Sequence, residues 1–107
     1  MPDAVILYRV FQKRVGPVIE GYRARVRVLP DGRRAYRPGE GGTVFAEVVG
    51  DKETGEPEYG SWSLTRAGAK VREEHRLLSV IDAFKRTVEM KEERLKQTEQ
   101  LEVKSDE

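Results

Sequence analysis

The sequence contains no cysteine, no asparagine and only one histidine among its 107 residues. The absence of cysteine excludes a disulfide framework, a thiolate metal site and a thiol nucleophile. His75 has no second metal ligand four residues away, and the adjacent Glu73 and Glu74 do not share its face of a helix. We therefore expect no metal site.

Long apolar segments are also missing. The longest run, Ala4–Tyr8, is far shorter than the roughly 20 residues that cross a membrane, and no signal-peptide pattern surrounds it. We expect a soluble, cytoplasmic protein with no membrane partner. The lack of asparagine, together with abundant Arg and Glu, suits a heat-adapted source, although a GC-rich genome would give the same bias.

Signatures of catalysis are absent too. Ser61, Ser63 and Asp82 stand in no nucleophile motif, and "GEGG" at 39–42 lacks the lysine and the flanking elements of a phosphate-binding loop. The sequence therefore predicts a small binding protein that is not an enzyme and needs no cofactor.

Positive charge is concentrated in the first half of the chain. The whole sequence is nearly neutral, with 20 basic and 19 acidic residues, but residues 1–50 hold nine basic and only five acidic side chains. An anion-binding surface is therefore expected in this half.

The pattern along the chain predicts one α+β domain over residues 1–107. Residues 1–64 have the Val-, Tyr- and Phe-rich segments and Gly/Pro breaks of an antiparallel sheet with four or five strands. Residues 65–100 have helical periodicity, with Ser63 or Thr65 as the candidate cap, and 101–107 are expected to fray. The predicted strands are 4–13, 18–29, 33–37, 43–50 and 61–64, with a polar loop at 51–60.

The long helix carries one apolar stripe, formed by Leu77, Ile81, Phe84, Val88 and Leu95. Such a stripe is typical of a helix that packs on a core, here the sheet face bearing Val26, Val28 and Tyr36. The helix is longer than a small sheet can cover. Its last turns therefore either protrude or are buried by a partner, such as a second copy whose antiparallel helix covers Leu95 and Leu101.

The segment "LPDGR" at 29–33 predicts a tight hairpin with Gly32 in the left-handed conformation. This turn sets Leu29 opposite Arg33, Val26 opposite Tyr36 and Arg25 opposite Arg37. Because side chains alternate between the faces of a sheet, one face carries a basic row and the other an apolar set. The basic row is Arg23, Arg25, Arg27, Arg33 and Arg37; the apolar set is Tyr22, Ala24, Val26, Val28 and Tyr36.

Two interpretations of the basic row remain open. In the first, the arginines bind the phosphates or bases of DNA or RNA, and Lys13 and Arg14 extend the patch. In the second, Glu20, Glu47 or acids of the helix neutralise the row in a network of surface ion pairs.

The stretch from Tyr22 to Arg37, a basic strand with a "PDGRR" turn and a returning strand, resembles the small DNA-binding modules at the front of phage integrases. The resemblance implies DNA binding. It ends after the hairpin, because in those modules a helix follows the third strand directly, whereas here a Gly-rich connection and a further strand intervene.

A protein-binding function is the alternative. A small regulator or complex subunit, for example a phage or mobile-element modulator of host machinery, would use the helix and the 51–62 loop. Its candidate contact residues are Tyr59, Trp62, Leu95 and Leu101, although Trp62 also suits the core or the sheet edge.

Overall fold

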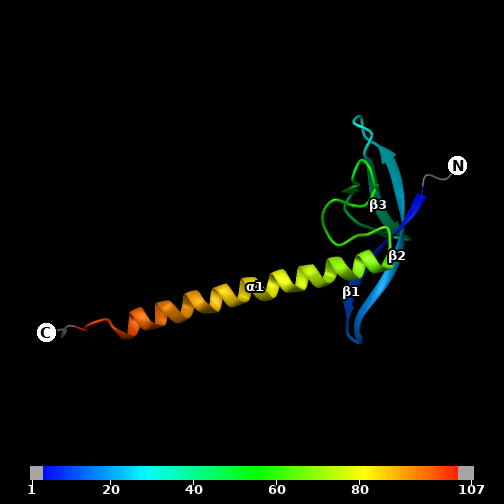
Figure 1. Ribbon diagram of the computed structural model, residues 1–107. Coiled ribbons are helices and arrows are strands. Elements are labelled where there is room, and N and C mark those ends of the chain that lie inside the picture. The colour runs from blue at the N-terminus through cyan, green and yellow to red at the C-terminus, as the bar shows by residue number, and fades with distance from the viewer. Residues whose placement is uncertain (1–3, 104–107) are drawn as a thin grey trace. The chain divides into compact units, whose positions relative to one another are not determined.

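The computed structural model describes residues 4–103 and shows an antiparallel sheet followed by one long helix (Figure 1). The α+β class predicted from the sequence is confirmed. The chain divides into two compact units, Met1–Arg76 and Leu77–Glu107, so the boundary between them falls inside the helix. No helix in the described range is long and apolar enough to cross a membrane.

The sheet has five antiparallel strands. They are β1 (Ala4–Lys13), β2 (Gly16–Val28), β3 (Arg34–Glu40), β4 (Thr43–Val44) and β5 (Val48–Val49). β1 and β2 form a long hairpin, β3 pairs with the other edge of β2, and both short strands pair with β3.

Two predicted strands differ from the structure. The segment 43–50 forms two short strands, because residues 45–47 leave the ladder between β4 and β5. The predicted strand 61–64 makes only a bridge to β1, in which Ser63 and Tyr8 exchange two backbone hydrogen bonds of 2.7 and 2.9 Å. The third strand also extends beyond the predicted range 33–37, since β3 continues to Glu40.

The hairpin between β2 and β3 has the register that the turn sequence predicts. Val26 lies opposite Tyr36 and Arg25 opposite Arg37. The amide of Leu29 donates to the carbonyl of Arg33 at 2.8 Å, and Gly32 has a φ of 91°, which a residue with a side chain rarely adopts. The turn therefore fixes which side chains share a face.

The core lies on the apolar face of the sheet, where Leu7, Ala24 and Tyr36 are fully buried. Four aromatic rings pack edge-on or tilted against one another above it, with ring centroids 5.1–6.2 Å apart. These rings belong to Phe11, Tyr22, Phe45 and Trp62. Such contacts each add stability beyond the area that they bury.

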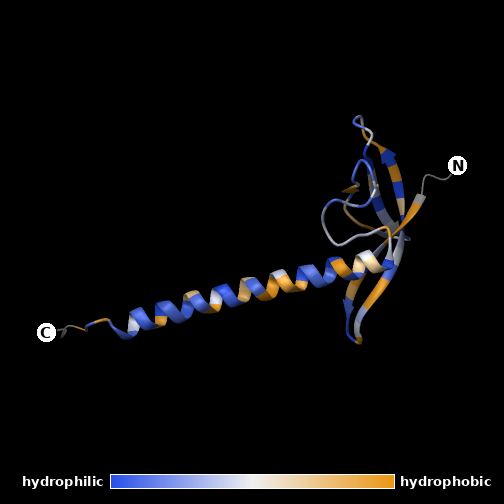
Figure 2. Cartoon of the chain, in the orientation of Figure 1, coloured by the Kyte–Doolittle hydropathy of each residue, from blue (hydrophilic) through white to orange (hydrophobic). Residues whose placement is uncertain are grey.

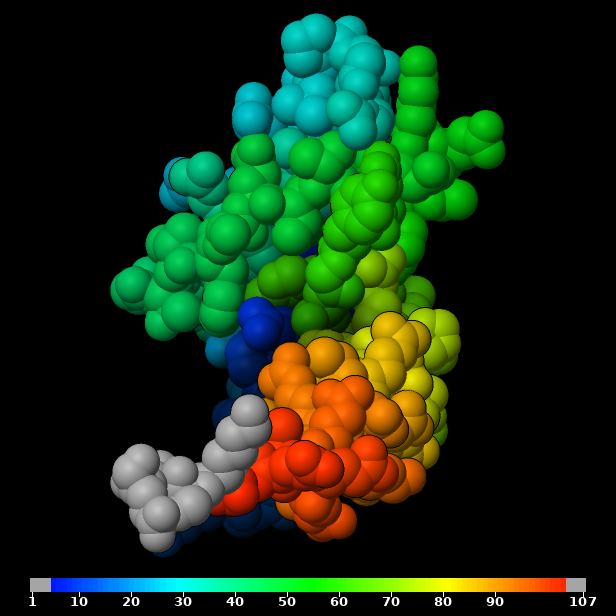
Figure 3. Space-filling view, turned by 90° about the vertical axis from the view of Figure 1, so that its left-hand side faces the viewer, coloured from blue at the N-terminus to red at the C-terminus, as the bar shows by residue number. Residues whose placement is uncertain are grey.

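The segment 45–64 covers this core. It supplies Phe45, Val48, Trp62 and Leu64 to the cluster, and the residues of this segment (green) spread over the face of the first unit shown in Figure 3. The side chains of the predicted helix stripe are instead exposed, from 39% at Leu77 to 67% at Phe84. The prediction that this stripe forms the core is therefore wrong. The physical reason is that the 45–64 segment already fills the apolar face.

The polar loop at 51–60 is held by hydrogen bonds. The carboxylate of Asp51 accepts bonds from the amides of Glu53 and Thr54, and the buried Tyr36 hydroxyl donates to the carbonyl of Gly55 at 2.6 Å. Because Tyr36 belongs to the core, this bond ties the loop to the sheet.

The helix α1 (Arg66–Glu99) begins and ends close to the predicted bounds. Thr65 is its cap, since its hydroxyl accepts a hydrogen bond of 3.0 Å from the amide of Gly68. Residues 101–103 are not helical, and the remainder of the predicted tail, 104–107, lies outside the described residues.

A polar network fastens the first turns of α1 to β1 within the first unit. The carboxylate of Glu73, which is 7% exposed, accepts bonds from the Gln12 amide at 2.7 Å and from the Arg76 guanidinium at 2.6 and 3.0 Å. These hydrogen bonds stabilise the ionised carboxylate and lower the pKa of Glu73 to about 2.

We predict that acid weakens the first unit through Glu73. Since the pKa of this carboxyl lies below its ordinary value of 4.5, its contribution to stability is complete above about pH 5 and is lost as the pH falls toward 2. Urea unfolding followed by the fluorescence of Trp62, the only tryptophan, measures this loss. In Glu73→Gln the loss should be smaller, while the exposed Glu74→Gln should match the unmodified protein. An equal loss in all three proteins would contradict the prediction.

Candidate nucleic-acid interface

The predicted basic row lies on the face of the sheet opposite the core. Arg23, Arg25 and Arg27 alternate along β2 with the core-facing Ala24 and Val26. Arg37 of β3 lies directly opposite Arg25. Arg33 follows the turn. The structure therefore places Arg23, Arg25, Arg27 and Arg37 as the register predicted, whereas Arg33 lies next to the turn, outside the strands.

Two of the five arginines are neutralised by acids of the first unit. The guanidinium of Arg27 donates two hydrogen bonds, of 2.8 and 2.9 Å, to the carboxylate of Glu47, and this contact lowers the pKa of Glu47. Arg33 contacts Asp31 at 2.6 Å and Glu58 at 3.4 Å. The ion-pair interpretation thus holds for Arg27 and Arg33.

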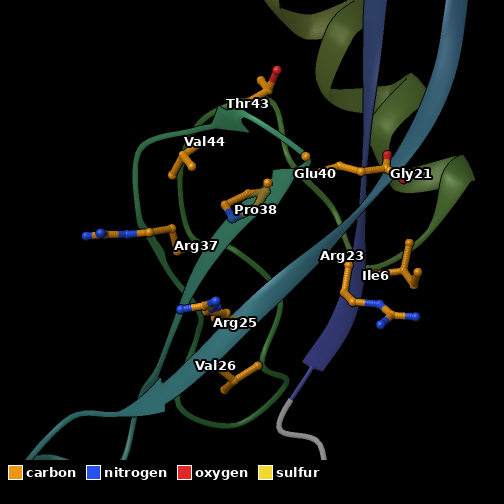
Figure 4. Close-up of a pocket in the computed structure, with 12 residues that line it drawn as sticks. Ile6, Gly21, Arg23, Arg25, Val26, Arg37, Pro38, Glu40, Thr43 and Val44 are labelled. Carbon is orange, nitrogen blue, oxygen red and sulfur yellow. The ribbon is translucent and has the colours of Figure 1, made fainter.

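The other three arginines are exposed and make no ion pair among residues 4–103. These are Arg23, Arg25 and Arg37, which line a groove of about 1150 Å³. Figure 4 shows Arg23 and Arg25 extending from β2, and Arg37 from β3. Glu40 is the one acidic side chain of the groove lining, so the lining carries a net charge of two positive units.

The groove exists because β3 leaves β2. Pairing between the two strands ends where Ala24 faces Pro38, and proline has no backbone N–H to extend a ladder. β3 then turns back into β4 through Gly41, whose φ is 60°. One wall is therefore β2 and the other is the β3–β4 hairpin, with Ile6 and Val44 as apolar lining.

Lys13 and Arg14 do not extend this surface. They lie at the turn of the β1–β2 hairpin, whereas Arg25 pairs with Ala4 at the other end of the same ladder. At about 3.3 Å per residue, the ten-residue β1 separates these ends by roughly 30 Å. Lys13 is also paired with Glu20 at 2.7 Å.

The sequence reasoning missed a stacked pair on the basic face. Tyr8 lies opposite Gly21, and its ring lies so close that a Cβ at position 21 would come within 2.9 Å of it. The guanidinium of Arg66 lies over the same ring, 4.9 Å from its centroid. Tyr8 is two residues from Ile6, so this pair is next to the groove. The strand periodicity of 4–13 could have placed Tyr8 on this face, but no sequence signal brings Arg66 to it.

The predicted protein-binding residues are in different environments. Trp62 is 4% exposed and belongs to the aromatic cluster, so it is not accessible to a partner. The prediction that Trp62 is a protein-contact residue is therefore wrong. Tyr59 is 80% exposed. Leu95 and Leu101, in the second unit, are also exposed, and Leu101 lies beyond the end of α1.

The sequence matches no protein-family model, and neither a curated protein nor a solved structure matches the chain.

We predict that Gly39→Ala loosens the groove wall. A Cβ at this position would lie 2.8 Å from the carbonyl oxygen of Thr43, so the β3–β4 hairpin must shift, at a cost of about 1–3 kcal/mol. Amide exchange of Phe45, whose N–H donates to the Pro38 carbonyl, should accelerate. Gly42→Ala is the matched control, because nothing lies within 4 Å of its added Cβ. Unchanged exchange in Gly39→Ala would show that the hairpin is not closely packed.

Proposed function

We propose that the protein is a non-enzymatic nucleic-acid-binding protein that holds a phosphate backbone in the groove between β2 and the β3–β4 hairpin. The observation that supports this most directly is that only some of the arginines in the basic row have an acidic partner. Arg27 and Arg33 have acidic partners, whereas Arg23, Arg25 and Arg37, which line the groove, have none among the described residues.

The chemistry of the groove suits phosphates. A guanidinium presents a planar fork of donors that matches the oxygens of a phosphate, and it is charged at all physiological pH values. Arg25 and Arg37 face each other across the two strands, where their like charges repel each other weakly. A phosphate between them would remove the repulsion and gain charge-assisted hydrogen bonds.

The size of the groove favours an extended ligand. Pockets for small molecules commonly measure about 300–1,000 Å³, and this open groove of about 1150 Å³ exceeds that range. The stacked Tyr8 and Arg66 add a planar, cationic surface next to it. Unpaired bases stack on such surfaces, a feature that distinguishes nucleic acid from other polyanions.

Charge reversal inside the groove should abolish binding. We predict that Arg25→Glu combined with Arg37→Glu removes detectable binding of a fluorescent oligonucleotide, measured by anisotropy. The control Arg14→Glu together with Lys13→Glu has the same change of net charge at the far end of the β1–β2 hairpin and should leave the affinity nearly unchanged. Equal losses in the two double variants would show that only net charge matters.

The salt dependence of the unmodified protein tests the same contacts. Three phosphate contacts should weaken binding roughly twenty- to fortyfold between 50 and 200 mM salt. Single-stranded and duplex oligonucleotides of one sequence, together with heparin, are the ligands to compare. Stronger binding of the single strand would fit the stacked Tyr8 and Arg66. Salt-independent binding, or heparin binding as tight as that of either nucleic acid, would contradict the proposal.

Releasing Arg27 should strengthen binding. Glu47→Gln removes the carboxylate that holds this guanidinium, and Arg27 lies two residues from Arg25 on the same face. We predict tighter binding and a salt slope that is steeper by up to about 0.7–0.9, the value expected for one further phosphate. An unchanged slope would mean that Arg27 lies outside the binding surface.

One specific observation favours the protein-binding alternative: Tyr59, in the 51–62 loop, is 80% exposed. An exposed tyrosine can act as an anchor in a partner's pocket. Tyr59→Ala would weaken capture of a partner from nuclease-treated lysate if this alternative is correct, and it would leave oligonucleotide binding unchanged. We propose a cytoplasmic location for either function.

A further inference from the structure

The second unit carries an exposed apolar stripe that follows a coiled-coil spacing. Leu77, Ile81, Phe84 and Val88 lie at steps of four, three and four residues along α1 and are 39–67% exposed. Figure 2 shows hydrophobic positions recurring among hydrophilic ones along this helix. A stripe of this kind is normally buried against another helix.

The stripe ends on opposite charges. Glu74 precedes Leu77 by three residues and Lys91 follows Val88 by three, so the same heptad spacing places an acid at one end and a base at the other. Both side chains are exposed, and neither forms an ion pair in the part of the chain that the structure describes. Two copies of the stripe that run in opposite directions are therefore complementary in charge.

We propose that α1 pairs with the α1 of a second copy in an antiparallel, two-fold symmetric coiled coil centred between Asp82 and Ala83. In this register Ile81 packs against Phe84 of the second copy, and Leu77 against Val88. Glu74 then lies opposite Lys91 of the second copy, at both ends of the apolar contact. A two-fold axis requires this self-complementarity.

Charge excludes the neighbouring arrangements. A parallel pair would set Lys91 against its own copy and Glu74 against its own copy, with like charges at core positions. An antiparallel pair shifted by seven residues would set Lys91 opposite Ile81 in one direction and Glu74 opposite Phe84 in the other. Only the proposed register leaves the four apolar residues in contact with one another and matches the charges at both ends.

The proposed contact between the two copies involves only part of α1. Leu95 continues the stripe beyond Lys91, and Leu101 lies past the helix end, so neither is needed for the contact. The pairing is also independent of the groove, because none of its residues lies in β2, β3 or β4. Failure of one proposal therefore leaves the other intact.

The absence of cysteine makes the register directly testable in the full-length protein. Glu74→Cys and Lys91→Cys would introduce the only thiols in the molecule. We expect that neither variant alone forms a disulfide dimer rapidly, and that an equimolar mixture forms a mixed disulfide between positions 74 and 91. Peptide mass spectrometry after mild oxidation identifies the linked positions.

Matched controls share the same axial positions. Ser79→Cys and Arg86→Cys are related by the same two-fold axis but face away from the stripe, so their mixture should crosslink more slowly. Rapid disulfides within Glu74→Cys alone or Lys91→Cys alone would indicate a parallel pair and overturn the proposal. Sedimentation equilibrium that shows only monomer at micromolar concentrations would also overturn it and would leave the stripe to a different protein.

A charge-reversal cycle gives a second measurement. Glu74→Lys and Lys91→Glu should each weaken the dimer about tenfold or more, because each places like charges opposite one another at both ends. The double variant should recover most of the affinity in the proposed register. If the double variant is as weak as the single variants, the antiparallel register is wrong. Trp62 fluorescence verifies that each variant remains folded.

Discussion

The turn at Pro30–Gly32 is the constraint on which the rest of the first unit depends. Its geometry fixes the pairing of β2 with β3, and strand alternation then sends every second side chain to the same face. A shift of one residue would move the arginines of β2 into the core and expose Ala24. Because a buried, unpaired guanidinium is very costly, the core and the basic face specify the same register. The basic row is therefore a direct consequence of the way this hairpin folds.

A second constraint, Pro38, turns the flat basic face into a groove. Beyond Pro38, β3 does not continue the ladder on β2, and the glycines that follow let the chain fold back as β4. Because β3 leaves β2 after Pro38, Arg23 has no β3 residue opposite it and lies beside the open space of the groove. Two of the acids that pair with the basic row, Glu47 and Glu58, belong to the segment that covers the core, and the third, Asp31, lies in the turn itself.

Local sequence signals predicted those parts of the structure that local physics determines. The first strand and the hairpin register follow from apolar runs and turn residues, and capping propensity limited the helix cap to Ser63 or Thr65. The sequence did not predict that the segment 45–64 covers the core, because the short and broken strands in 43–64 have little periodicity of their own. The helix stripe from Leu77 to Val88 has a stronger apolar periodicity than the segment 43–64. The sequence therefore predicted that the stripe fills the core position that Phe45 and Trp62 occupy. Long-range packing, here among aromatic side chains, decided between them.

The charge distribution on the basic face carries more information than the number of arginines. Repulsion between two exposed charges is weak, since unit charges 4 Å apart in water interact by only about 1 kcal/mol, and salt screens them further. A folded protein can therefore carry Arg25 opposite Arg37 without a ligand. The informative feature is that Glu47, close enough to both Arg27 and Arg37 for each charge to lower its pKa, makes its hydrogen bonds with Arg27. The guanidinium of Arg27, outside the groove, is thereby held in place, while Arg37, which lines the groove, makes no ion pair among residues 4–103.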